Sequence, residues 1–212
     1  MKTADAARVF AFFISAIALA GIALNLAMLS DTLGDPLRSL WILLGYFTIL
    51  TNLIVGIVFG VVALRGPGAV DTRILGGTTL SIMLVGVIYA LLLSGVPHLA
   101  GVTVITNILH HQLTPVLVPL FWLLFTQKGT LNWRDPVIWA AYPLAYAGYA
   151  LLRGTVEGHF AYGFIDYVTN GVLKVAMTIL IIALAFLITG WLIVLLDRVL
   201  AQQRGKSETI RK

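Results

Sequence analysis

The segment WILLGYFTILTNLIVGIVFGVVALR, residues 41–65, is apolar over a length that can span a bilayer. It nevertheless contains three polar side chains, those of Thr48, Thr51 and Asn52. Counted from Arg38, the charge that precedes the segment, Thr48 lies ten residues in, or about 15 Å along a continuous helix. A threonine at that depth is near the middle of a membrane, where polar residues are uncommon and often functional.

Small and polar residues recur at every fourth position of this segment, at Thr48, Asn52, Gly56 and Gly60. Residues at this spacing share one face of a helix, and small residues allow two membrane helices to approach closely. We therefore expect the stripe to face protein rather than lipid. Taken alone, the stripe fits a packing seam at least as well as a chemical site.

The composition of the chain is that of a polytopic membrane protein. It has 212 residues, of which 59% are hydrophobic and 11% charged, and its mean hydropathy is +0.97. A soluble domain of this length cannot bury so much apolar surface. Cysteine is absent, which excludes disulfides, thiol catalysis and cysteine-ligated metals.

Apolar segments of spanning length occur at residues 9–28, 40–64, 74–96, 102–125, 136–152 and 172–196. The sequence therefore predicts an all-α fold, a bundle of six transmembrane helices. Residues 1–200 would form a single transmembrane domain, and residues 201–212 a basic tail. The first segment is too long for the apolar part of a signal peptide, so we expect it to be retained.

The basic residues predict how the bundle is oriented. Of the fourteen lysines and arginines, only Arg38, Arg153 and Lys174 lie on one side of the predicted membrane, and the other eleven lie on the opposite side. Because cytoplasmic loops carry the excess of positive charge, both termini are predicted to be inside. The net charge of +5 then reflects topology in a cytoplasmic membrane and predicts no nucleic-acid partner.

The fourth segment has two adjacent histidines, His110 and His111, followed by Pro115. Proline cannot donate a hydrogen bond to the carbonyl of His111, so we expect a bend and a lined cavity at this point. Counted from Gly101, His111 is also roughly 15 Å deep, at the level of Thr48. The two histidines project about 100° apart, so they are not expected to serve one function together.

The loop at residues 153–170 is rich in aromatic residues and faces outward in this topology. It fits a lid over the cavity and simple packing equally well. A zinc site is an alternative interpretation, since several potential ligands share the outer side. These are His98, His110 or His111, His159 and Asp166. Their spacing matches no zinc motif, so we predict no metal and no cofactor.

Three segments resemble a known family: Tyr46-Phe47-Thr48 with Gly60, His111 with Pro115, and Tyr162-Gly163-Phe164-Ile165-Asp166 with Gly171. They are similar to the androgen-induced six-helix membrane proteins, eukaryotic hydrolases of fatty acid esters of hydroxy fatty acids, and to bacterial relatives of these enzymes. Gly163 stands where the family usually has proline. His110 beside His111 leaves the family's histidine ambiguous by one residue, although the spacing to proline favours His111.

The resemblance implies that Thr48 is a nucleophile, that His111 is its base, and that the substrate is a fatty acyl ester in a bacterial cytoplasmic membrane. Threonine needs such a base, and histidine accepts a proton near neutral pH. Asn52 is then expected to orient the hydroxyl or to stabilise an oxyanion. His110, Tyr162 and Asp166 would support the site or bind substrate. The alternative from another class is a lipid carrier or receptor that holds the same ligand without cleaving it.

Overall fold

The computed structural model describes residues 2–93 and 101–210, and every regular element of that part of the chain is helical. In chain order the elements are α1 (Lys2–Leu33), α2 (Pro36–Leu43), α3 (Phe47–Arg65), η1 (Pro67–Ala69), α4 (Thr72–Ile88), η2 (Tyr89–Leu93), α5 (Val102–Ile108), η3 (Leu109–Leu113), α6 (Thr114–Phe125), α7 (Asp135–Glu157), η4 (Gly163–Ile165), α8 (Tyr167–Asn170) and α9 (Val172–Ile210). η1 and η4 are short 3₁₀ helices, whereas η2 and η3 are single π-helical turns.

Five helical segments in the described part of the chain are long and apolar enough to cross a membrane. They are Thr3–Leu33, Phe47–Arg65, Thr72–Leu93, Val102–Phe125 and Val172–Gln203. This agrees with the predicted all-α, multi-pass membrane protein. α7 has the length of a span, at 23 residues, but it is less apolar because of its tyrosines and its charged ends. The predicted tail continues α9 as helix to Ile210.

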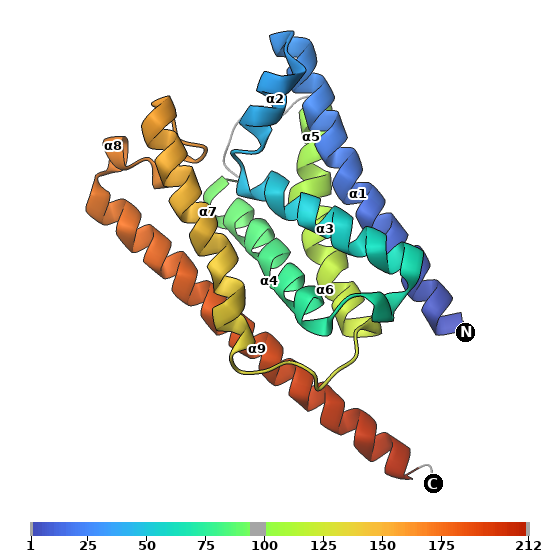
Figure 1. Ribbon diagram of the computed structural model, residues 1–212. Coiled ribbons are helices and arrows are strands. Elements are labelled where there is room, and N and C mark those ends of the chain that lie inside the picture. The colour runs from blue at the N-terminus through green and yellow to red at the C-terminus, as the bar shows by residue number, and fades with distance from the viewer. Residues whose placement is uncertain (1, 94–100, 211–212) are drawn as a thin grey trace.

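The helices form two groups joined by α4 (Figure 1). α1, α3, α5 and α6 pack together, and α7 lies beside α9. α4 lies between them and contacts α3 and α6 on one side and α7 and α9 on the other. Both termini lie toward the lower right of Figure 1, at the opposite end of the bundle from α2 and α8.

The prediction of one continuous helix over residues 40–64 is wrong. α2 ends at Leu43 and α3 begins at Phe47, with Gly45 in the turn between them. The carbonyls freed by the break are bound by tyrosine hydroxyls of α7, which donate to the oxygens of Leu44 and Gly45. The 15 Å depth counted along one helix therefore does not apply to Thr48.

Below the break, the stripe of α3 faces protein as predicted. The oxygen of Gly56 accepts a hydrogen bond of 2.7 Å from Ser15 of α1, and a Cβ on Gly56 would collide with Leu19. Asn52, one turn earlier, bonds to Thr114 of α6. Glycine thus sets a close α1–α3 contact, and the N-terminal end of α3 meets the middle of the segment Val102–Phe125.

Candidate active site

Thr48 and His111 meet where the first turn of α3 approaches the π-turn η3. The Oγ1 atom of Thr48 lies 3.3 Å from Nε2 of His111, and the Thr48 side chain is 8% exposed. A hydroxyl within hydrogen-bond reach of an imidazole nitrogen is the geometry of a nucleophile and its base, which is often somewhat loose without substrate.

The π-turn explains how two adjacent histidines come to serve different neighbours. η3 precedes Pro115, which lacks the N–H that a regular α-helix would need there. Within η3, His110 points to α1, where its Nε2 lies 3.2 Å from the oxygen of Ala18 and its side chain is 1% exposed. Gly21 leaves room for its ring. His110 is therefore a packing residue between helices, whereas His111 faces Thr48.

Tyr89 and Asn107 fix the ring of His111. The ring of Tyr89 stacks on the imidazole with centroids 4.4 Å apart, and the side-chain amide of Asn107 donates to the Tyr89 hydroxyl at 2.7 Å. The Nδ1 atom of His111 is buried without a hydrogen bond of normal geometry, while the carbonyl of Asn107 interacts with the ring. A proton on Nδ1 directed to that carbonyl would leave Nε2 as the acceptor for Thr48.

Asn52 contacts the main chain of Thr48 and not its hydroxyl. Its side-chain Nδ2 donates to the carbonyl of Thr48 at 2.9 Å, and its Oδ1 accepts from Thr114 at 2.8 Å. Its side chain is fully buried. Asn52 therefore holds the main chain at Thr48 and ties α3 to α6, and its amide is not directed at the hydroxyl.

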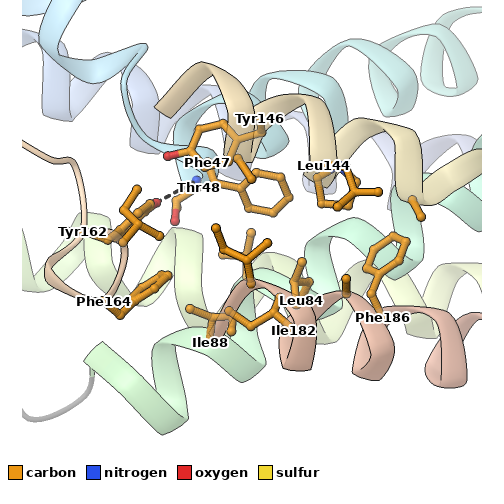
Figure 2. A pocket seen from close by; sticks show the side chains of 17 residues that line it. Phe47, Thr48, Leu84, Ile88, Leu144, Tyr146, Tyr162, Phe164, Ile182 and Phe186 are labelled. Carbon is orange, nitrogen blue, oxygen red and sulfur yellow. Dashed lines mark hydrogen bonds between the residues drawn. The ribbon is translucent and has the colours of Figure 1, made fainter. Parts of the chain in front are cut away.

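Tyr162 reaches the same turn from the loop that follows α7. The main-chain N–H of Thr48 donates to the Tyr162 hydroxyl over 3.4 Å, as the dashed line in Figure 2 shows. The ring packs edge-on against Tyr46 and stacks on Phe164. Burial raises the pKa of the Tyr162 phenol, so the group keeps its proton and remains a donor.

Asp166 shapes this loop. Its carboxylate caps α8 by accepting from the amides of Val168 and Thr169 and from the Thr169 hydroxyl at 2.6 Å. These bonds, the hydroxyl first, lower the pKa of Asp166. Asp166 does not line the cavity next to Thr48. Asp166 therefore stabilises the loop that carries Tyr162 and does not itself contact the site.

A cavity of about 90 Å³ begins at Thr48 and runs between α4, α7 and α9. Figure 2 shows Thr48 and Tyr162 at one end of it and Leu144 and Phe186 at the other. Of the described residues that line it, Thr48, Tyr146 and Tyr162 have hydroxyls and the others are apolar. The candidate nucleophile therefore sits at the polar end of an apolar chamber.

Three tyrosines of α7 bind the break and the start of α3. Tyr142 lies 2.9 Å from the Thr51 hydroxyl, Tyr146 donates to the Gly45 oxygen at 2.8 Å, and Tyr149 donates to the Leu44 oxygen at 3.3 Å. Their i, i+4, i+7 spacing places them on one helix face, a signal present in the sequence.

Arg153 completes this attachment near the C-terminal end of α7. Its guanidinium donates to Glu157 at 2.8 Å and to the Tyr149 hydroxyl at 2.9 Å, and it lies over the ring of Trp41 in α2. Trp41 in turn donates to Glu157 at 2.7 Å. The network fastens α2 to α7 and thereby fixes the break that precedes Thr48.

The ligands of the alternative zinc site do not gather in the part of the chain that the structure describes. No group of three or more His, Asp or Glu side chains suited to a metal is found there. His110 and His111 face different neighbours, and Asp166 caps a helix. His98 lies outside the described residues.

Comparisons of this chain with protein-family models, with curated proteins and with solved structures found no match.

Proposed function

We propose that this protein is an intramembrane hydrolase of lipid esters, with Thr48 as nucleophile and His111 as base. The observation that carries the proposal is the 3.3 Å approach of the Thr48 hydroxyl to His111 Nε2 at the mouth of an apolar cavity. A buried hydroxyl next to an imidazole suits acyl transfer, and the apolar lining suits the fatty acyl part of an ester.

The reaction would proceed in two halves. Thr48 Oγ1 attacks the ester carbonyl carbon as His111 Nε2 takes its proton, and the tetrahedral intermediate then expels the alcohol, which receives that proton. A water molecule next attacks the threonyl ester, again losing a proton to His111. The fatty acid leaves, and the proton returns to Thr48.

The oxyanion would be stabilised at the start of α3. The N–H of Thr48 belongs to the first turn, whose amides have no partner inside the helix, and it donates to the Tyr162 hydroxyl over 3.4 Å. In the proposal the oxyanion takes the place of this long bond and accepts from both groups. We do not assign this role to Asn52, because one N–H of its amide donates to the Thr48 carbonyl and its side chain is fully buried. Tyr162 replaces it as the proposed side-chain donor.

We further propose that the chain is a distant member of the family of androgen-induced six-helix membrane hydrolases. Two of the three resembling segments supply the Thr48–His111 pair, and the third supplies Tyr162. The same proposal includes six spans, with α7 as the additional one. Its 23 residues cover about 34 Å, enough to cross a bilayer.

The absence of cysteine makes the topology simple to test by single-cysteine labelling in a bacterial cytoplasmic membrane. With six spans and both termini inside, His159→Cys after α7 should react with an impermeant maleimide in intact cells. Ala69→Cys between α3 and α4 should react only after lysis. Labelling of both positions from the same side would contradict the proposed arrangement.

Purified protein in nanodiscs provides the test of function. Thr48→Ala and His111→Ala should each abolish hydrolysis of a long-chain ester and labelling by a fluorophosphonate probe, and the double variant should be no worse than either single variant. His110→Ala, the matched control, should reduce the melting temperature and retain turnover per folded molecule. Wild-type turnover by Thr48→Ala would refute the proposed mechanism.

The same assay distinguishes a hydrolase from a lipid carrier. A carrier would bind the ester in the apolar cavity and release it intact. Wild-type protein and Thr48→Ala would then both fail to hydrolyse the ester, and they would not differ in labelling by the probe.

A further inference from the structure

The cavity beside Thr48 does not end at the contact between α7 and α9. A groove of about 500 Å³ lies on the other side of that contact, and three residues line both spaces. They are Leu144 of α7 and Ile179 and Ala183 of α9. These three side chains are therefore the partition between the inner cavity and the outer groove.

The residues next to the partition are small. Ala147 lines the inner cavity, Ala176 lines the outer groove, and Ala183 lines both. Where alanines face each other, two helices can lie close while leaving side-chain space between them. A modest movement of Leu144 or Ile179 would then join the two spaces.

Among the residues that the structure describes, none that lines either space is charged. The outer groove is bordered by Leu180 and Val172, which are 58% and 70% exposed on the surface of α9. Because α9 is long and apolar enough to cross a membrane, such side chains would face the acyl chains of the bilayer. The groove thus begins in lipid, and the cavity ends at the candidate nucleophile.

We propose that the inner cavity is the binding site for one acyl chain and that this chain enters from the bilayer between α7 and α9. The chain would lie from Thr48 to Phe186, and Leu144, Ile179 and Ala183 would form the portal. This inference rests on the proposed function for the position of the ester carbonyl at Thr48. Between Ile179 and Phe186 the cavity follows α9 for roughly 10 Å at 1.5 Å per residue.

A photoreactive lipid tests the location without requiring catalysis. A fatty acyl ester with a diazirine near the end of its chain is incorporated into nanodiscs with the Thr48→Ala variant, irradiated, and mapped by mass spectrometry. Modification is expected on α7 and α9, at Leu144, Ile179, Ala183 or Phe186. Modification confined to other lipid-facing positions, such as Val9 of α1 or Ile57 of α3, would overturn the proposed site.

A matched pair of substitutions on α9 tests selectivity. Ala183→Phe fills the portal, whereas Ala185→Phe adds the same ring two residues on, at an exposed position that lines neither space. The ratio of kcat/KM for a long-chain ester to that for an acetyl ester should fall about tenfold or more in Ala183→Phe, since a pocket misfit has effects of that size. It should stay unchanged in Ala185→Phe.

Melting in detergent checks that both variants fold, and Ala147→Leu serves as a second filling variant if Ala183→Phe does not. If a folded Ala183→Phe or Ala147→Leu variant has the wild-type ratio of kcat/KM for the two esters, the proposed acyl site is wrong. The proposed hydrolase activity would not be affected by that result. The photoreactive lipid could instead label the portal while ester hydrolysis proves not to depend on Thr48. The acyl site would then stand, and the proposed hydrolysis would fail.

Discussion

The ring of Tyr89 lies nearly parallel to the imidazole of His111, with a 20° angle between the planes and 4.4 Å between the centroids. The contact joins the π-turn at the end of α4 to the π-turn η3. Since Thr48 contacts the same imidazole through Nε2, the position of the Tyr89 ring decides how well the proposed base is aligned.

Removing that ring should reduce the rate more than it reduces substrate binding. Stacked aromatic pairs contribute about 0.5–1.5 kcal/mol beyond buried area, so we expect Tyr89→Ala to lower kcat roughly two- to tenfold with little change in KM. Tyr89→Phe retains the stack and loses only the bond from Asn107, so its kcat should lie closer to that of wild type. Equal kcat values in all three proteins would show that the stack does not align His111.

The turn before Thr48 should tolerate no side chain at Gly45. A Cβ there would lie 2.9 Å from a guanidinium nitrogen of Arg153 and 3.0 Å from the oxygen of Ile42. We expect Gly45→Ala to destabilise the protein by about 1–3 kcal/mol, as overpacking of a tight contact does. Gly148→Ala in α7 is the control, since nothing lies within 4 Å of its Cβ. Thermal unfolding in detergent should show a lower midpoint for the first variant only.

The room that Gly21 leaves for His110 should appear as an energetic coupling between the two residues. A Cβ on Gly21 would lie 2.8 Å from Cδ2 and 2.9 Å from Cε1 of the ring. Gly21→Ala should therefore be strongly destabilising in the wild-type protein and nearly neutral in the His110→Ala background. For residues in contact, a double-mutant cycle measures coupling energies of about 0.5–3 kcal/mol, and a value near zero would contradict this packing.

The cap on α8 should loosen in acid. The folded-state pKa of Asp166 is lowered, so the carboxylate stabilises the loop fully above its ordinary pKa of 3.8 and loses this effect as pH falls through the lower folded value. Hydrogen-exchange protection of the Val168 and Thr169 amides should decline in that window. Asp166→Asn should remove the pH dependence, whereas a decline of the same size in this variant would assign the effect to another group.

The sequence predicted the helical membrane class because apolar length and composition are local properties. It also drew attention to Thr48 and His111, whose contact depends on the close packing of α3 against α1 and on the π-turn. The route to that pairing was partly wrong, since Thr48 begins a helix and does not lie in the middle of one. Thr48 and His111 are thus in contact, although the depth of Thr48 counted along one helix was wrong.

The break at residues 44–46 had no local signal strong enough to predict it. Its residues are apolar apart from Gly45 and the hydroxyl of Tyr46, and no proline interrupts the segment. What stabilises the break comes from far along the chain: Tyr146, Tyr149 and Arg153 are about a hundred residues away. The spacing of the tyrosines could be read from the sequence, but their partners could not.

The π-turn η3 contains one residue more than a regular helix needs to cover the same length, and this residue acts as a phase shift between the two halves of the fourth span. Each added residue rotates the following helix by about 100°. α5 and α6 can therefore present different faces to their neighbours: α5 packs on α1, whereas α6 packs on both α1 and α4. Any insertion or deletion of one residue between Leu109 and Leu113 would put the two halves out of phase and separate His111 from Thr48.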